Sequence, residues 1–443
     1  MREIYIPMEI FQREYVGKLA LALALSSKGA RVFIGGNHAV KSKALKGVSG
    51  SVYFETKGMS PKGMDYLLEL RKIGFTIIGQ DEEAGISFKE FSSFAKTRPE
   101  LNGIAFFDKF FAWGDADYNF LEKEITSANI VKSGSARTLF WGENGKEFYD
   151  EKKRALEAKY GPYVLLVSNL GLRNNLMSKR QMKKYTIKSG YGVVEYSTPE
   201  RENWELKAFE IINEIIEKVS EDTNFRLLLR PHPSENSYPW EEKFKDNSKV
   251  IVSKEGNFLP VALAASHILH AGSTAAIEAM LCEKSTISFQ SLIEFEDEAM
   301  LANYYCQSTS SIQDLVEKIN SGEEFLALEG FYKEIKSKVQ SYNDPKIVFD
   351  QAEEILATKS NKSLKFETLH SVRTRRDAGR IERLFDRIKY GKSDYELLDK
   401  NKRPRIALDE IDADSKRIIQ ILGLSTQVSI TEISDSFFMI QKK

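Results

Sequence analysis

The run from Arg230 to Glu235, Arg-Pro-His-Pro-Ser-Glu, directly follows the apolar residues 227–229. Open α/β sheets bind ligands at the carboxyl ends of their strands. An arginine and a histidine at such a strand end could therefore neutralise an anionic ligand. With five histidines and eleven prolines in 443 residues, a His-Pro pair occurs by chance about 0.1 times per chain. The interpretation therefore depends on the position of His232-Pro233 at a strand end rather than on the dipeptide itself.

A second run, from His270 to Glu278, turns from an expected strand through Gly272 into an alanine-rich helix. The start of such a helix has free backbone N–H groups, and Ser273 and Thr274 add two hydroxyl groups. Aligned N–H donors and the helix dipole stabilise a phosphate at this point, and a glycine lets the ligand approach the backbone closely. The alternative is that Ser273 only caps the helix.

Three adjacent carboxylates, Asp81, Glu82 and Glu83, follow the apolar strand expected at 75–80. One member of such a group can act as a base or a nucleophile, because crowding and a closed cleft tune the acidity of a carboxylate. The alternative is a solvated acidic loop. We favour a catalytic role for this run, because it is expected at the ligand-binding edge of the first domain. The runs 230–235 and 270–278 are expected at the corresponding edge of the second domain, which would face it.

The turn Gly35-Gly36-Asn37 follows the strand expected at 31–36. Such a turn can admit a ligand or merely close a tight loop. The sequence has no G-x-G-x-x-G run after its first strand and no G-x-x-x-x-G-K-S/T run. A nicotinamide dehydrogenase and a P-loop nucleotidase are therefore both disfavoured.

Charge and cysteine usage narrow the class of protein. Lysine plus arginine and aspartate plus glutamate number 64 each, so no overall field attracts the protein to nucleic acid, and we expect no nucleic-acid partner. Two cysteines, Cys282 and Cys306, are too few for a disulfide framework or a thiolate zinc site, and we expect neither a metal nor a cofactor. No stretch approaches about eighteen consecutive apolar residues, which predicts a cytoplasmic protein.

The elements that must position these residues alternate between strand and helix. At 443 residues the chain is too long for one hydrophobic core, and alternation predicts parallel sheets covered on both faces. We therefore expect two doubly wound α/β domains, at 1–155 and 156–345. The strands expected in the first are 3–8, 31–36, 51–56, 75–80, 103–107 and 128–134, with helices at 11–28, 61–73 and 147–159. The strands expected in the second are 163–169, 225–231, 249–254, 267–272 and 285–290, with helices at 200–220, 260–265 and 273–282.

The last part of the chain, 346–443, does not alternate, and we expect a helical, partly basic extension. Residues 371–405 contain twelve Lys or Arg against six Asp or Glu. One interpretation is a solvated appendage that packs on the domains. The other is a patch for anionic lipid heads, which would place the protein peripherally at the inner face of the cytoplasmic membrane.

These motifs resemble bacterial glycosyltransferases of the GT-B type, with two Rossmann-like domains, that use CMP-activated ulosonic acids. Bacterial sialyltransferases carry an acidic element followed by glycine, an HP motif and then a Ser/Thr phosphate element, and capsular and lipopolysaccharide β-Kdo transferases share the HP element. Over 1–345 the chain is most similar to bacterial surface carbohydrate biosynthesis proteins. The residues that carry the resemblance are Pro7-Met8-Glu9, Arg13-Glu14, Asp81-Glu82-Glu83-Ala84-Gly85, Asn169, RPHPSE at 230–235 and GSTAAIEA at 272–279.

The resemblance implies transfer of a Kdo or nonulosonate sugar from its CMP donor to a polysaccharide or glycolipid acceptor. Asp81 is the favoured carboxylate, as a base in an inverting reaction or as a nucleophile in a retaining one. Ala84 departs from the family pattern, which leaves Glu82 and Glu83 open. His232 and the Ser273-Thr274 helix end would neutralise the single phosphate of the leaving CMP without a metal.

Other residues have two interpretations each. Arg230 could engage the ulosonate carboxylate or pair inside the sheet, and Glu235 could bind the ribose hydroxyls or cap a helix. Asn169 could line the donor side of the cleft or form a turn. Pro233 and Gly272 belong to the expected donor site. The residues expected on the acceptor side of the cleft are Arg13, Gly35, Gly36 and Asn37.

Competing functions remain open from the sequence. A CDP-polyol phosphate transferase of the teichoic-acid type also uses histidine in such motifs, but His38 is followed by alanine, so the N-terminal part has no second HP element. A non-catalytic scaffold for polysaccharide assembly is disfavoured by the presence of Asp81 and His232. A UDP-sugar epimerase of the same fold would bind its ligand in the same cleft.

Overall fold

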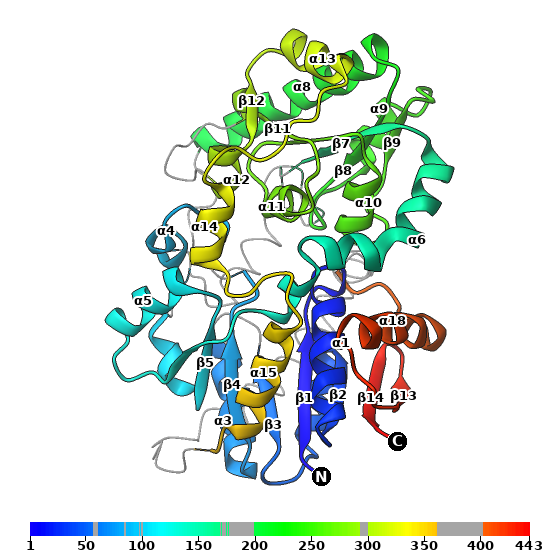
Figure 1. The fold of residues 1–443 in the computed structure, drawn as a ribbon. Helices are drawn as coiled ribbons and strands as arrows, with labels where there is room; N and C mark the ends of the chain where they lie inside the picture. Colours follow the sequence, from blue (N-terminus) through cyan, green and yellow to red (C-terminus); the bar gives the residue numbers. More distant parts are fainter. Residues whose placement is uncertain are drawn as a thin grey trace, which may run out of the picture.

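The computed structural model describes residues 1–55, 61–83, 86–96, 98, 101–168, 170, 174, 176, 199–292, 300–360 and 402–443. Two α/β domains lie one above the other in Figure 1, each built on a sheet, and both chain termini belong to the lower domain. The expected α/β class with two doubly wound domains is confirmed, since within each sheet the strands from 3–132 and from 163–309 pair in parallel.

The first sheet has the order β13-β14-β2-β1-β3-β4-β5-β6. Its strands are β1 (Glu3–Met8), β2 (Arg31–Gly36), β3 (Val52–Glu55), β4 (Thr76–Gln80), β5 (Lys109–Ala112), β6 (Ile130–Lys132), β13 (Val428–Ser434) and β14 (Phe437–Lys442). Its helices are α1 (Phe11–Ser27), α2 (Asn37–Ala44), α3 (Pro61–Ile73), α4 (Phe91–Lys96) and α5 (Asp115–Glu124), with 3₁₀ turns η1 (Leu101–Phe106) and η2 (Ala136–Phe140).

The second sheet has the order β12-β11-β10-β7-β8-β9. Its strands are β7 (Tyr163–Val167), β8 (Arg226–Arg230), β9 (Val250–Val252), β10 (His267–His270), β11 (Thr286–Phe289) and β12 (Gln307–Thr309). The helices that cover it are α8 (Pro199–Asp222), α9 (Tyr238–Lys243), α10 (Phe258–Ala264), α11 (Thr274–Leu281), α12 (Leu301–Tyr305) and α13 (Ile312–Ser321), with a 3₁₀ turn η3 (Gln290–Leu292). The connecting helices are α6 (Glu143–Tyr160) and α14 (Phe331–Lys338).

Helix α1 is buried on nearly every side because it lies between the first sheet, η2 and the C-terminal part of the chain. Its sequence, FQREYVGKLALALALSS, is correspondingly apolar and small. Gly17 is where α1 and η2 touch, since a Cβ at this position would lie 2.5 Å from Arg137 Cα. This close approach holds η2 beside the first turns of α1, which face the second domain.

The C-terminal extension differs from the expected helical appendage. Helices α15 (Lys346–Ala357) and α18 (Leu408–Ile421) pack on α1, but β13 and β14 form an antiparallel hairpin whose second strand pairs with β2 (Figure 1). The expectation of an entirely helical extension is therefore wrong at 428–442. Buried Phe437, Phe438 and Ile440 and the need to cover the β2 edge explain the hairpin.

The strand expected at 103–107 is also wrong, because these residues belong to η1 and to the turn after it. The chain joins the sheet only after Asp108, whose carboxylate accepts the Ile77 N–H at 2.7 Å and pairs with Arg71 at 2.9 Å. Phe106 and Phe107 are buried in the turn. A short apolar run is compatible with a buried turn as well as with a strand, and here the Asp108 anchor decides between them.

Candidate functional site

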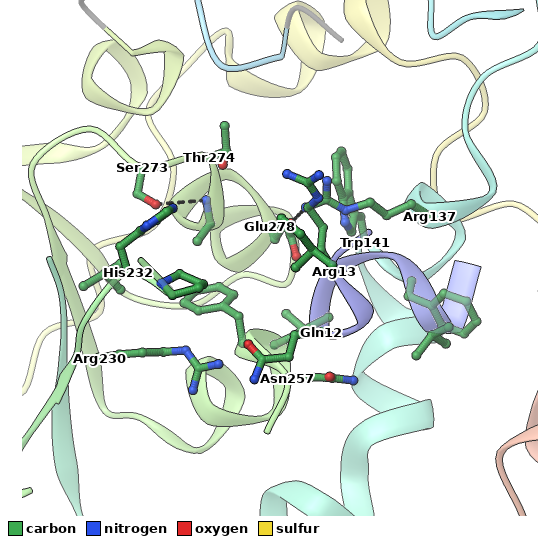
Figure 2. A pocket seen from close by; sticks show the side chains of 18 of the residues that line it. Gln12, Arg13, Arg137, Trp141, Arg230, His232, Asn257, Ser273, Thr274 and Glu278 are labelled. Atoms are coloured by element: carbon green, nitrogen blue, oxygen red, sulfur yellow. Dashed lines mark hydrogen bonds and ion pairs between the residues drawn. The ribbon is translucent and has the colours of Figure 1, made fainter. Parts of the chain in front are cut away.

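A cavity of about 280 Å³ lies between the two domains, where the carboxyl ends of both sheets face each other. Figure 2 shows Arg230, His232 and Ser273 on one wall and Arg13, Arg137 and Trp141 on the other. The second domain contributes the ends of β7, β8 and β10 and the starts of α10 and α11. The first contributes the start of α1 together with η2. Sequence runs that are far apart in the chain therefore meet at one site.

The turn that carries His232 is held by Glu235. The fully buried Glu235 carboxylate accepts the N–H of His232 at 3.1 Å and that of Leu170 at 2.8 Å, as well as the Ser168 hydroxyl at 2.9 Å. Burial raises the pKa of Glu235 to about 7 although these donors oppose the shift. Glu235 thus ties the end of β7 to the turn after β8, and its two oxygens serve the protein's own donors.

His232 itself is exposed to the cleft. Its Nδ1 lies 2.7 Å from the Ser234 hydroxyl. Desolvation by the surrounding protein, and then the positive charges of Lys402 and Lys254, lower the pKa of His232 to about 4. The imidazole is therefore neutral at physiological pH, and it can donate or accept one hydrogen bond toward a ligand.

Arg230 is a buried cation in the cavity wall. Its Nη atoms donate to the backbone carbonyls of Glu255 at 2.8 Å and Gly256 at 2.6 Å. No carboxylate of the described residues forms an ion pair with it, and burial lowers the pKa of Arg230 to about 10. The sequence left open a pairing inside the sheet, and the structure shows carbonyl contacts instead, so no carboxylate in the described part of the chain cancels its positive charge.

The start of α11 forms the adjacent part of the wall. The Ala275 N–H donates to Ser273 Oγ at 3.2 Å, so Ser273 is the N-cap of the helix, as one of the two sequence interpretations stated. Gly272 has φ of 105°, and its N–H donates to His270 Nδ1 at 3.0 Å. The Thr274 side chain also lines the cavity. A phosphate at this helix start would meet the helix dipole and the two hydroxyl groups.

The acidic residues lie on the first-domain side, and Asp81 and Glu83 are held by arginines. Arg98 Nε donates to Asp81 Oδ2 at 2.7 Å and Arg98 Nη2 to Asp81 Oδ1 at 3.2 Å. Glu83 pairs with Arg13 and with Arg98, both at 2.8 Å, and these two cations outweigh burial and lower the pKa of Glu83. Arg13 lines the cavity, whereas Asp81, Glu82 and Glu83 do not belong to its wall.

Glu82 is placed differently from its two neighbours. Its Oε1 lies 3.5 Å from the buried Lys18 Nζ, and its Oε2 is buried and accepts no hydrogen bond from the described residues. Lys18 also pairs with Glu14 at 2.6 Å. Burial raises the pKa of Glu82 even though Lys18 opposes the shift. Glu82 is therefore the carboxylate of the run with an oxygen not committed to the protein.

Sequence reasoning missed an ion pair across the cleft. Arg137 Nη2, from η2, bonds Glu278 Oε1, from α11, and its guanidinium lies over the Trp141 ring at 5.3 Å (Figure 2). Both charged side chains line the cavity. Neither residue belongs to a motif that predicts an ion pair, although Glu278 lies within the run GSTAAIEA at 272–279.

The glycine turn of the first domain lies outside the cavity wall. A Cβ on Gly35 would be 2.7 Å from the Ser436 carbonyl oxygen, so this glycine makes room for the C-terminal hairpin. A Cβ on Gly36 would contact Arg403 and Phe11 at 3.7 Å, and Asn37 is buried at the start of α2. Asn169 lies outside the described residues, as do 371–401 of the basic stretch.

Two further findings concern metals and membranes. Within the described ranges, no group of three or more His, Cys, Asp or Glu side chains is placed to hold a metal ion. No helix in the same part of the chain has the length and apolar character needed to cross a bilayer. Cys282 and Cys306 are free and buried.

No protein-family model and no curated protein matches the sequence. Among solved structures, UDP-GlcNAc 2-epimerase of Methanocaldococcus jannaschii, in complex with UDP-GlcNAc and UDP, is 15% identical with a TM-score of 0.46, over 80% of this chain and 99% of that one. A variant of the wall teichoic acid polymerase TagF is 11% identical with a TM-score of 0.45, over 73% and 76%. The N-terminal domain of Candida albicans trehalose-6-phosphate phosphatase is 13% identical with a TM-score of 0.32, over 73% of each chain. The two facing Rossmann-like domains of this chain have the GT-B arrangement.

Proposed function

We propose that the protein transfers an ulosonic acid, of the Kdo or nonulosonate type, from a CMP-activated donor to a surface polysaccharide or glycolipid acceptor. The observation that carries the proposal is the buried Arg230, which no carboxylate of the described residues neutralises, beside the start of α11 in one interdomain cavity. A buried cation next to a helix N-terminus stabilises a bound anion. A CMP-ulosonate has two anionic groups, the phosphate and the sugar carboxylate.

In this proposal the second domain binds the donor. The N–H groups and hydroxyls at the start of α11 would bind the phosphate, and neutral His232 would donate a hydrogen bond to it. Arg230 would bind the ulosonate carboxylate through N–H groups not used by the two carbonyls. Negative charge develops on the phosphate as its bond to the anomeric carbon breaks. The donors at the start of α11 and His232 would stabilise this charge and so favour release of CMP.

The first domain would supply the carboxylate that acts on the acceptor. As the acceptor oxygen bonds to the anomeric carbon, its proton passes to a carboxylate and CMP departs. Asp81 remains a prediction for this role, but both of its oxygens bond Arg98. Glu82 has one oxygen that accepts no hydrogen bond from the described residues, and burial raises its pKa, so this oxygen is the one best able to accept a proton. We therefore place Glu82 before Asp81.

A second candidate is transfer of a polyol phosphate from a CDP-activated donor. Arg13 and Arg137 also line the cavity, although each is paired with a carboxylate, Glu83 and Glu278 respectively. A diphosphate has more charge than a single phosphate and would bond these two cations in place of their carboxylates. We also propose a cytoplasmic location with peripheral contact to the inner membrane through 371–405. Binding of the protein to anionic vesicles tests this part of the proposal.

The first experiment is thermal unfolding with CMP, CDP, UDP and ADP at matched excess. A ligand at one hundred times its dissociation constant adds about 2.7 kcal/mol to the free energy of unfolding. We expect a shift with CMP that is lost in His232→Ala. A shift with CDP larger than that with CMP would favour the polyol phosphate reaction, and a shift with UDP alone would overturn both candidates.

A further inference from the structure

The ion pair between Arg137 and Glu278 joins the two domains inside the cavity. Arg137 belongs to η2 of the first domain and Glu278 to α11 of the second, and both side chains are largely buried, with 12% and 14% of their surface exposed. The other Nη atom of Arg137 donates to the Glu82 carbonyl at 3.3 Å. One guanidinium thus connects the acidic run of the first domain to the helix at which we place the donor phosphate.

Glu278 is poorly placed for the anion that this helix start would bind. Thr274 and Glu278 are four residues apart, so they lie on the same face of α11, about 6 Å apart along its axis. A carboxylate at that distance repels a phosphate at the helix start. Arg137 is the cation that the structure places beside Glu278, and it offsets this charge while the cavity holds no anion.

The backbone that carries Arg137 is firmly positioned. Gly17 allows η2 to pack against α1, and the Ala136 N–H donates to the buried Gln351 side chain at 3.0 Å. The long side chain of Arg137, rather than η2, is therefore the part able to change partner. Its guanidinium lies over the Trp141 ring at 5.3 Å, a contact that does not depend on which anion the guanidinium bonds.

We propose that Arg137 is a donor-binding residue that exchanges partners: it pairs with Glu278 in the free protein and bonds an anionic group of the donor when one enters the cavity. This inference rests on the proposed function only in that the donor is anionic. Glu278 then acts as a competitor that lowers the affinity for anions, and the exchange connects a group of the first domain to a ligand held by the second.

The test measures dissociation constants for CMP and for inorganic pyrophosphate by calorimetry. Arg137→Gln should weaken binding about tenfold, since it removes one charge-assisted contact. Glu278→Gln should strengthen binding about threefold or more, because it removes both the competitor and the repulsion. The matched control is Glu283→Gln, which removes the pair between Lys146 and Glu283 outside this cavity and should leave both constants unchanged.

The two variants are expected to change the affinity in opposite directions, and this distinguishes an exchange of partners from a purely structural ion pair. A purely structural ion pair predicts that Arg137→Gln and Glu278→Gln weaken binding equally, or that both lower the melting temperature and leave binding unchanged. Either result overturns the inference. If the wild-type protein binds neither CMP nor pyrophosphate, the proposed anion site itself fails and the inference with it. Binding by the wild type that Arg137→Gln and Glu278→Gln leave unaltered refutes only the exchange.

Discussion

The N–H of His232 donates to the carboxylate of Glu235 at 3.1 Å, so the residue that lines the cavity is positioned by one that does not. The same carboxylate holds Leu170 and Ser168 at the end of the neighbouring strand β7. The His-Pro turn is thereby attached to the sheet at two places. Of the two interpretations left open for Glu235, contact with the ribose or a structural role, its hydrogen bonds favour the structural one.

Replacing Glu235 by alanine should lower the free energy of unfolding by about 3 kcal/mol, because it leaves one buried N–H, one part-buried N–H and one buried hydroxyl without an acceptor. CMP affinity should fall in the same variant, since the His232 turn loses its anchor. Urea unfolding and calorimetry measure the two effects. Glu241→Ala, on an exposed position of α9, is the control, and an equal effect of both variants would contradict the anchoring role.

The stability of the wild type should decrease with rising pH relative to Glu235→Gln. The pKa of Glu235 is raised to about 7 in the folded protein from an ordinary value of 4.5, so folding favours the protonated form. This contribution is fully present below pH 4.5 and is lost as the pH rises through 7, and it amounts to roughly 3 kcal/mol. Urea midpoints of both proteins between pH 4.5 and 8.5 measure it; parallel curves would show that folding does not raise the pKa of Glu235.

Glu82→Gln should reduce transfer about a hundredfold or more while leaving CMP binding intact, because it removes the proposed base without changing the donor site. Asp81→Asn should have a smaller effect, which comes from loosening the Arg98 contact. Product formation and CMP affinity are measured on both variants. Normal turnover by Glu82→Gln together with an inactive Asp81→Asn would return the catalytic role to Asp81.

Gly17→Ala should weaken CMP binding although residue 17 carries no functional group. The new Cβ would lie 2.5 Å from Arg137 Cα, so η2 must move and Arg137 with it. We also expect a loss of about 1 to 3 kcal/mol in the free energy of unfolding, as is usual for overpacking. Calorimetry with CMP checks the first effect; unaltered affinity would show that the position of η2 does not matter to the site.

Phe438→Ala should destabilise the protein by about 3 to 5 kcal/mol, because the side chain is 1% exposed within the first domain's core. Ile433→Ala, at an exposed position of the same hairpin, should change the free energy of unfolding by less than about 0.5 kcal/mol. Chemical unfolding of both variants provides the measurement. A neutral Phe438→Ala would mean that the hairpin is a loosely attached appendage after all.

Much of the domain architecture could be predicted from local patterns. The apolar runs expected as strands at 163–169 and 225–231 contain β7 (Tyr163–Val167) and β8 (Arg226–Arg230). Both strands are buried on both faces of a parallel sheet, and burial of that kind leaves a continuous apolar signal. The placement of His232 and Ser273 at strand ends followed directly. The strand at 103–107 failed because an apolar turn has the same composition as a buried strand.

Apart from the turn at 103–107 and the hairpin at 428–442, the sequence by itself determined where the strands and helices form and which residues come at the ends of the strands, since these depend on apolar periodicity and turn residues a few positions apart. Only the tertiary structure decided which charges pair: Arg98 with Asp81, Arg137 with Glu278, and no carboxylate of the described residues with Arg230. It also decided that 437–442 pairs with β2. Such pairs form between residues far apart in the chain, and the energy of each depends on burial and distance, neither of which any local pattern encodes.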